Sequence, residues 1–193
     1  PVNPRHDAVE GLSCLRDPSG LPRGLDLAVV ALPARAVPEA VAACVRRGVR
    51  ALVVISSGFA EMGTPGGREL QERLAGTLKG TGTRLLGPNT LGYLVPGTGL
   101  DVLFLGPETF NRPGRGGVGL ISQSGSLAVD LMEELAASGT GLSMFLGLGN
   151  KVDVDEADVL LELSRDPGTS CAALYLESIT DGRRFFGALR ETA

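Results

Sequence analysis

Short apolar runs alternate with amphipathic helical patterns along most of this 193-residue chain. The first three runs lie at residues 25–32, 51–55 and 84–86, and helical spacings lie between them at 37–47 and 68–79. Apolar runs of this length are typical of strands that are buried on both faces of a parallel sheet. The order strand, helix, strand, helix, strand therefore predicts an α/β fold.

The same alternation returns after a stretch rich in glycine and proline, residues 87–116. We interpret this stretch as a linker that carries a short hairpin near residues 100–105. Further strands are expected at 117–121, 142–146 and 172–176, with helices at 126–137, 155–165 and 182–191. The sequence thus predicts two α/β domains, at residues 1–112 and 113–193.

Composition argues against several classes of function. The 18 Lys and Arg against 22 Asp and Glu give a net charge of −4, and there is no basic run that would follow a nucleic-acid backbone. No apolar segment reaches the roughly 18 residues of a membrane span, and no signal-peptide pattern opens the chain. The 3 cysteines, without CxxC spacing, indicate neither a disulfide framework nor a zinc site. We therefore expect a cytoplasmic protein with neither nucleic acid nor membrane as partner.

Small and polar residues follow every expected strand. In open α/β sheets ligands bind beyond the carboxyl ends of the strands, so these loops form the candidate site. They comprise Pro33 and residues 56–59, 87–90, 122–126, 147–153 and 177–178. Any turn favours Gly, Ser, Asn and Pro, but so many such loops in succession favour a binding function.

The most specific of these loops is residues 122–126, Ser-Gln-Ser-Gly-Ser, where the apolar run 117–121 ends and a helical pattern begins. The first amides of a helix have no intrahelical acceptor. Hydroxyl groups and a glycine beside such amides suit a phosphate or phosphoryl group. The turn therefore predicts phosphate chemistry, without saying which kind.

Two charged residues at strand exits have more than one interpretation. Glu177 follows the run 172–176, and its carboxylate either orients a histidine or holds a metal, or is favoured there by a helix dipole. Lys151 can neutralise a phosphate, although a solvated loop lysine is the favoured interpretation when it is taken alone.

Other reactive side chains carry no functional prediction. An acidic group formed by Asp153, Asp155, Glu156 and Asp158 resembles a cation site. A helix dipole also favours acidic residues in the first turn, so we predict no metal site there. His6, the only histidine, is expected at the surface, and Cys44 and Cys171 are expected to be packing residues.

Six motifs in order resemble one family. They are residues 1–4 (PVNP), 26–34 (DLAVVALPA), 54–59 (VISSGF), 86–89 (LGPN), 120–125 (LISQSG) and 148–151 (LGNK). Together they resemble the ADP-forming acyl-CoA synthetases, relatives of the succinyl-CoA synthetase α subunit, over essentially the whole chain. The resemblance implies an incomplete Rossmann-like CoA-binding domain followed by a flavodoxin-like parallel-sheet ligase domain.

The resemblance also implies roles for individual residues. In the family an acyl phosphate meets coenzyme A, and a histidine carries phosphate between that site and a nucleotide. By similarity, the residues that contact CoA are Pro33, Ile55, Ser56, Ser57, Gly58, Asn89, Asn150 and Lys151. Ser124, Gly125 and Ser126 match the helix start that faces the phosphohistidine, and Glu177 matches the carboxylate that hydrogen-bonds it.

Some parts of the family pattern have no counterpart in this sequence. The first strand with its glycine-rich loop, the family histidine and the ATP-grasp domain are not among these residues, so we expect a central fragment that is inactive alone. The implied partners are CoA, phosphate, a small carboxylic acid, and an ATP-grasp domain or β subunit that binds ATP or ADP with Mg²⁺; oligomerisation stays open. Val129 replaces a substrate-binding tyrosine of the succinyl enzyme, which favours a small monocarboxylate such as acetate.

Two functions remain open at this point. The first is a part of an ADP-forming acyl-CoA synthetase, which makes acyl-CoA, ADP and phosphate from an acid, CoA and ATP. The alternative is a non-catalytic CoA or acyl-CoA sensing module of a protein acetyltransferase fusion. A downstream histidine with an ATP-grasp region would favour the enzyme, and an acetyltransferase domain would favour the sensor.

Overall fold

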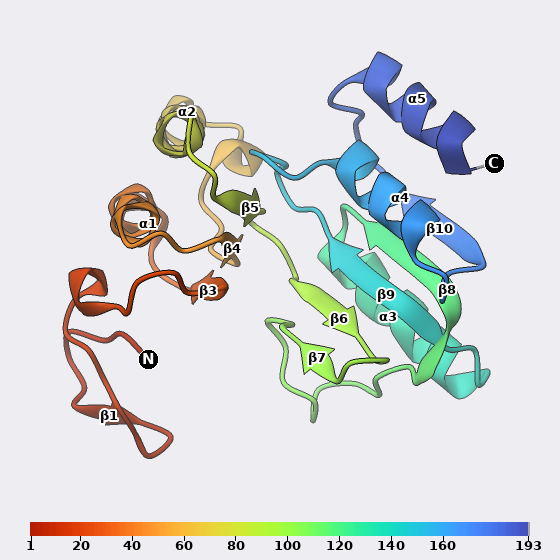
Figure 1. The fold of residues 1–193 in the computed structure, drawn as a ribbon, viewed down its shortest axis with the longest axis horizontal. Coiled ribbons are helices and arrows are strands. Elements are labelled where there is room, and N and C mark those ends of the chain that lie inside the picture. Colours follow the sequence, from red (N-terminus) through yellow and green to blue (C-terminus); the bar gives the residue numbers. More distant parts are fainter. Residues whose placement is uncertain (193) are drawn as a thin grey trace. The chain divides into compact units, whose positions relative to one another are not determined.

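The computed structural model describes residues 1–192, and the chain divides into two compact units, residues 1–85 and 86–193 (Figure 1). The division precedes the expected boundary at 112–113. Residues 93–101 pair with strands of the second unit, which places the glycine- and proline-rich stretch with that unit.

The first unit is built on a three-stranded sheet. Its order is β3-β4-β5, with β3 at Leu27–Val30, β4 at Ala51–Val54 and β5 at Arg84–Leu86. β3 and β4 run parallel, with Leu27 opposite Ala51 and Val30 opposite Val54. All three strands coincide with apolar runs of the sequence, so the strand prediction is confirmed.

Two helices cover this sheet and pack against each other (Figure 1). α1 spans Val37–Arg46 with Pro38 in its first turn, and α2 spans Pro65–Leu78. The Thr64 hydroxyl caps α2 by accepting a hydrogen bond from the Gly67 amide at 3.1 Å. Val41, Val54, Phe59, Leu74 and Leu85 are fully buried in the core of this unit.

Short elements complete the first unit. A hairpin pairs β1 (Ala8–Val9) with β2 (Leu12–Ser13), and 3-10 turns lie at Pro18–Gly20, Ala34–Ala36 and Ala60–Met62. His6 precedes this hairpin and is exposed, as the sequence predicts.

The second unit contains a five-stranded sheet in the order β10-β8-β9-β6-β7. Its strands are β6 (Tyr93–Val95), β7 (Leu100–Asp101), β8 (Arg115–Ser122), β9 (Leu142–Gly147) and β10 (Cys171–Tyr175). β10, β8 and β9 are parallel, as expected, while β6 runs antiparallel to β9 and to β7. The hairpin therefore lies at residues 93–101 rather than 100–105, because the paired strands flank the turn at 96–99.

Helices cover both faces of this second sheet. α3 (Gly125–Ala137) packs on one face, and α4 (Glu156–Arg165) and α5 (Gly182–Thr192) lie on the other (Figure 1). Neighbouring residues of β8 serve opposite faces, since Leu120 joins the core under α3 and Ile121 joins the core under α4. Val129 of α3 packs against the first of these cores.

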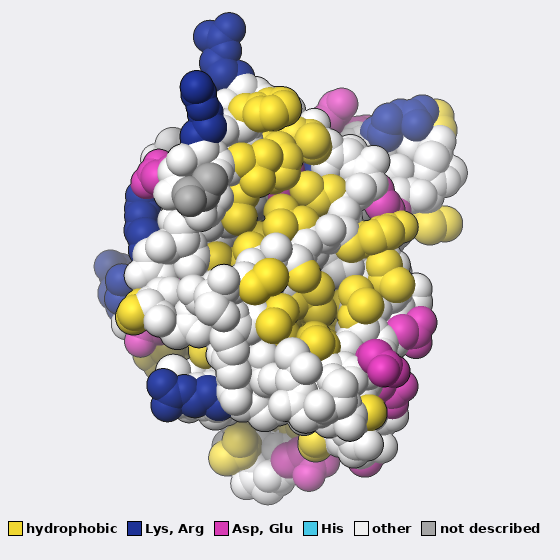
Figure 2. Space-filling model, turned by 90° about the vertical axis from the view of Figure 1, so that its right-hand side faces the viewer, with side chains coloured by type: hydrophobic (Ala, Val, Ile, Leu, Met, Phe, Trp, Pro, Cys, Tyr) yellow, Lys and Arg dark blue, Asp and Glu magenta, His cyan; other side chains and the backbone are white. Residues whose placement is uncertain are grey.

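Strand β10 forms one edge of the second sheet within the described residues. Cys171 at its start is exposed, so its interpretation as a packing residue is wrong. Cys44 of the first unit is buried as predicted, and burial raises the pKa of its thiol. Tyr175, Ile179 and Phe186 are also exposed, and hydrophobic side chains gather on this side of the second unit (Figure 2).

None of the helices within residues 1–192 combines the length and the apolar character that crossing a lipid bilayer requires.

Candidate functional site

The residues that the sequence singled out form two groups, one in each unit. Pro33 and residues 55–58 follow the carboxyl ends of β3 and β4 in the first unit. Asn89, residues 124–126, Asn150, Lys151 and Glu177 lie in loops of the second unit. The structure brings together the members within each group.

In the first unit, the ends of β3 and β4 are joined by the Ser56 hydroxyl, which accepts a hydrogen bond from the Leu32 amide at 3.0 Å. An open pocket of about 760 Å³ adjoins this point. It is lined by Pro33, Ala34, Arg35, Gly58, Met62, Thr64, Gly66, Gly67, Glu69, Leu70 and Arg73. Two predicted CoA-binding residues, Pro33 and Gly58, thus lie in its wall, while residues 55–57 lie outside the lining.

The lining of this pocket includes two residues that can bind phosphate, Arg35 and Arg73. The pocket volume lies within the range of small-molecule sites, and its lining combines apolar residues with Arg35, Arg73 and the acidic Glu69. Guanidinium groups bind phosphates through paired hydrogen bonds. Gly58 has a φ of +106°, and a Cβ there would lie 3.0 Å from the Ala34 Cβ, so this residue keeps the wall open. The two arginines are the residues of this lining that could bind the phosphates of coenzyme A.

In the second unit, residues 122–126 form a tight turn that opens α3, and we call them the phosphoryl turn. Ser122 Oγ donates to the Ser124 carbonyl at 2.7 Å and accepts from the Ser124 amide at 3.2 Å. Ser124 is the N-cap of α3, and its Oγ accepts from the Leu127 amide at 3.4 Å. Gly125 and Ser126 are exposed, and amides at these helix positions have no intrahelical acceptor.

Asn89 and Asn150 lie side by side although they are far apart in the sequence. The Asn89 side-chain amide donates to Asn150 Oδ1 at 3.4 Å, and the Asn150 backbone amide donates to the Pro88 carbonyl at 2.9 Å. Gly149 allows this approach, because its φ is +60° and a Cβ there would overlap the Pro88 oxygen. Two predicted CoA-binding residues therefore share one edge of the second unit.

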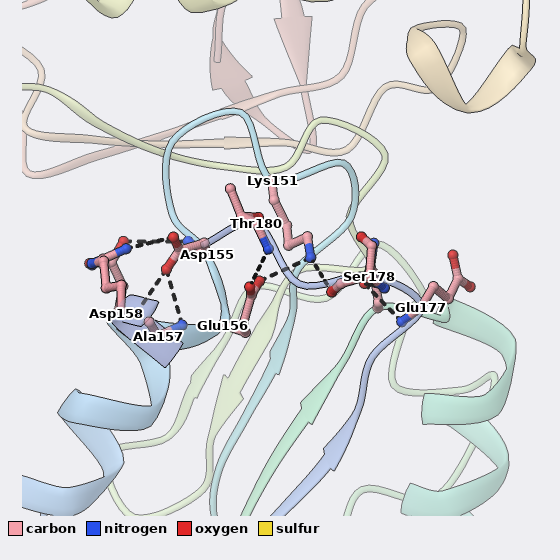
Figure 3. A network of polar contacts seen from close by, with 10 residues as sticks. Lys151, Asp155, Glu156, Ala157, Asp158, Glu177, Ser178 and Thr180 are labelled. Carbon is pink, nitrogen blue, oxygen red and sulfur yellow. Dashed lines mark hydrogen bonds and ion pairs between the residues drawn. The ribbon is translucent and has the colours of Figure 1, made fainter. Parts of the chain in front are cut away.

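Lys151 is buried, so its interpretation as a solvated loop lysine is wrong. Its side chain is 4% exposed, and its ammonium lies 2.9 Å from Oε2 of Glu156, whose side chain is 1% exposed. The ammonium also donates to the Ser178 carbonyl at 2.7 Å, and Figure 3 shows it between these two partners. Its role as a CoA ligand stays a prediction, which these contacts do not favour.

Glu156 is fixed by further contacts. Its Oε1 accepts a hydrogen bond from the Thr180 amide at 2.6 Å. Burial opposes the charged form of Glu156, but the hydrogen bonds from Lys151 and the backbone, together with the Lys151 charge, outweigh burial and lower the pKa of this carboxyl. Lys151 and Glu156 therefore form a buried ion pair.

The other acidic residues near α4 serve the helix itself. Asp155 is the N-cap and accepts from the amides of Ala157 and Asp158, each at 3.0 Å, while Asp158 completes a capping box. Arg184 of α5 pairs with both carboxylates. The interpretation as helix-terminal acidic residues is confirmed for Asp155 and Asp158, while Glu156 instead pairs with Lys151. The described residues 1–192 contain no group of three His, Cys, Asp or Glu side chains placed to hold a metal ion.

Glu177 follows β10 and is exposed, with its side chain pointing away from the buried ion pair (Figure 3). Its backbone amide donates to the side-chain carbonyl of Gln123 at 3.0 Å, and the Ser178 amide donates to the same oxygen at 3.2 Å. Gln123 belongs to the phosphoryl turn, so this one side chain connects the turn with the segment that carries Glu177.

Sequence reasoning missed Gln123 and Glu156 as members of the site. The signal for Gln123 was its place inside the phosphoryl turn at a strand exit, where a long polar side chain reaches the neighbouring loop. From the sequence, Glu156, like the neighbouring acidic residues, is explained by the preference of a helix dipole for negative charge. Nothing in the surrounding sequence indicates that its side chain is buried.

The fold and these two groups of residues define a class of protein, one that joins a CoA-binding unit to a flavodoxin-like ligase unit. Residues 1–96 match the CoA binding domain family, and residues 115–193 match the succinyl-CoA ligase like flavodoxin domain family. The α/β fold class expected from the sequence is thereby confirmed.

Known proteins agree with this assignment. The chain is 34% identical over its whole length to acetate–CoA ligase [ADP-forming] I of Archaeoglobus fulgidus, of which it covers 27%. It is 38% identical to the α subunit of acetate–CoA ligase [ADP-forming] I of Pyrococcus furiosus, with 90% of this chain and 36% of the relative aligned.

Solved structures show the same likeness. The structure of Ca. Korarchaeum cryptofilum dinucleotide forming acetyl-coenzyme A synthetase 1 in complex with phosphate and ADP aligns with a TM-score of 0.87 and 36% identity. That alignment covers all of this chain and 40% of the other. The chain belongs to the family of ADP-forming acyl-CoA synthetases, and it spans well under half the length of these relatives.

Proposed function

We propose that the full-length protein is an ADP-forming acyl-CoA synthetase, which converts a carboxylic acid, CoA and ATP to acyl-CoA, ADP and phosphate. The observation that carries this proposal is the phosphoryl turn at the start of α3, tied through Gln123 to the segment of Glu177. Helix amides and hydroxyls stabilise a transferred phosphoryl group, because they direct partial positive charge at its oxygens.

The residues of this chain have separate tasks in the proposed reaction. The first unit binds CoA at the pocket of Pro33, Arg35, Gly58 and Arg73, where CoA supplies the thiol that accepts the acyl group. In the second unit, Ser124, Gly125 and Ser126 hold a phosphoryl group delivered by a histidine of the full-length protein. Glu177 accepts a hydrogen bond from that histidine and fixes the tautomer whose other nitrogen is the nucleophile.

The nucleotide belongs to the finer part of this proposal. Phosphate and ADP are present in the Korarchaeum structure, and we propose ATP or ADP with Mg²⁺ as the nucleotide substrate of the full-length protein at an ATP-grasp domain or β subunit. The relatives named above are acetate–CoA ligases, which supports a small monocarboxylate as the acid. The sensing module of an acetyltransferase fusion gains no support from these relatives.

Product analysis of the full-length protein tests the proposal. We expect acyl-CoA and ADP to form in equal amounts when the protein is incubated with ATP, Mg²⁺, CoA and acetate, and we expect the reverse reaction from acetyl-CoA, ADP and phosphate. Formation of AMP in place of ADP would indicate adenylate chemistry and contradict the proposal. CoA binding without turnover of any of a panel of acids would favour the sensing module.

A further inference from the structure

The segment that carries Glu177, residues 176–180, contacts two other strand-exit loops of the second unit through side chains. On one side, Gln123 of the phosphoryl turn accepts hydrogen bonds from the amides of Glu177 and Ser178. On the other side, Lys151 donates to the Ser178 carbonyl, and Glu156 accepts from the Thr180 amide. Three side chains from outside the segment thus make four hydrogen bonds with the backbone of residues 177, 178 and 180.

The side chain of Gln123 binds the backbone of residues 177 and 178. The Gln123 backbone amide donates to the Tyr175 carbonyl at 2.9 Å, which places residue 123 beside the end of β10. Its side-chain oxygen accepts two amides, and its side-chain nitrogen donates to Ser178 Oγ at 3.3 Å. Both ends of the carboxamide are therefore engaged with residues 177 and 178.

Lys151 and Glu156 bind the backbone of the segment at residues 178 and 180. Their side chains are 4% and 1% exposed, so the pair is withdrawn from solvent (Figure 3). A buried ion pair contributes little net stability, because the cost of desolvating both charges offsets their attraction. Such a pair is better explained by the geometry it imposes, and here it fixes the carbonyl of residue 178 and the amide of residue 180.

We propose that Gln123 and Lys151 are positioning residues, which hold the backbone of Glu177 at a fixed place beside the phosphoryl turn. This inference rests on the proposed function. The Glu177 side chain is exposed and directed away from the ion pair (Figure 3). The contacts with the backbone therefore determine the position from which this side chain extends. Lys151 then acts through the segment, and it does not serve as a ligand of CoA phosphates.

The test uses the full-length protein and four variants. Gln123→Met removes the acceptor at nearly constant size, whereas Gln123→Glu retains an oxygen that accepts both amides. Lys151→Met removes the ammonium, and Lys151→Met/Glu156→Gln also removes the carboxylate charge that would otherwise be buried alone, which keeps the test valid if the single variant folds poorly.

Hydrogen exchange followed by mass spectrometry reports directly on the segment. In Gln123→Met we expect peptides with residues 176–180 to exchange at least about 10-fold faster than in the wild type, which corresponds to about 1.4 kcal/mol. Gln123→Glu is expected to restore most of the protection. Unchanged exchange in Gln123→Met would overturn the proposal.

Function is measured in parallel as phosphoenzyme formation from radiolabelled ATP and as CoA affinity by calorimetry. We expect phosphoenzyme formation to fall at least 10-fold in Gln123→Met and in both Lys151 variants, with the Kd of CoA within twofold of the wild type. A raised Kd for CoA with normal phosphorylation would instead make Lys151 a CoA ligand and overturn its positioning role.

Activity of the wild-type protein separates the proposed function from the positioning role. A wild-type protein that forms neither phosphoenzyme nor acyl-CoA overturns the proposed function, and the catalytic part of this inference with it. A wild-type protein that is active while Gln123→Met is equally active overturns only the positioning role.

Discussion

The ammonium of Lys151 lies 2.9 Å from a carboxylate oxygen of Glu156, and both side chains are almost completely buried. The two residues belong to different elements, since Lys151 is in the loop after β9 and Glu156 opens α4. This pair joins the loop, the helix and the segment of Glu177 in the second unit.

Breaking the pair from one side is expected to be more harmful than removing both charges. Lys151→Met leaves the Glu156 carboxylate buried alone, and we expect the free energy of unfolding to fall by about 3 kcal/mol. Lys151→Met/Glu156→Gln should recover a large part of that loss. Urea unfolding of the three proteins measures this, and a double variant less stable than Lys151→Met would contradict the account.

The stabilising contribution of Glu156 is expected to depend on pH. Because the pKa of Glu156 is lowered in the folded protein, its contribution is complete above the usual glutamate pKa of about 4.3 and is lost as the pH falls through the lower folded value. The stability difference between wild type and Glu156→Gln should therefore be constant near neutral pH and shrink in acid. Unfolding measured across this range checks it, and a difference that grows in acid would show the opposite linkage.

Much of the fold is predictable from the sequence, and particular residues show why. The runs 51–54 and 84–86 lack polar alternation, and each forms a strand buried on both faces. The amphipathic pattern predicts a helix over residues 126–137, and α3 spans Gly125–Ala137 with Ser124 as its N-cap. These signals are local, so the sequence carries them.

The contacts of Gln123 and Lys151 with the segment of Glu177 are long-range, and sequence reasoning missed them. Gln123 bonds to amides of residues 177 and 178, and no periodicity indicates which loop a glutamine will reach. A lysine in a polar loop is usually solvated, so the sequence does not indicate that Lys151 is buried. Its side chain is buried because it pairs with Glu156 in the first turn of α4. The sequence predicts the hairpin near residues 100–105, whereas its strands span residues 93–101. The glycines and prolines in this stretch interrupt the alternation of apolar and polar residues that marks a strand.

Gly149 provides a matched test of the close approach between two loops. Both Gly149 and Gly139 have left-handed φ values, +60° and +71°, but a Cβ meets the Pro88 oxygen at Gly149 and nothing within 4 Å at Gly139. We expect Gly139→Ala to cost about 1 kcal/mol from backbone strain alone, and Gly149→Ala to cost about 1–3 kcal/mol more from the overlap. Equal losses in urea unfolding would show that the approach is not tight.

Gly125 offers a test of the phosphoryl turn that leaves the core intact. A Cβ at Gly125 meets only the Leu91 Cβ at 3.9 Å, so Gly125→Val should fold while its side chain covers the first amides of α3. We expect phosphoenzyme formation to fall at least about 10-fold, since these amides stabilise the transferred group. Gly182→Val, at the start of α5 with open space around it, is the control and should phosphorylate normally. Equal behaviour of the two variants would remove the turn from the mechanism.

The role of Glu177 in phosphoryl transfer is tested by measuring phosphorylation and CoA binding in one variant. Glu177→Gln in the full-length protein keeps the size of the side chain and removes its charge. We predict that phosphoenzyme formation from radiolabelled ATP falls about 100-fold, as expected for loss of a positioned acid–base partner, while the Kd of CoA stays near the wild-type value. Phosphorylation at the wild-type rate would contradict the account and exclude Glu177 from phosphoryl transfer.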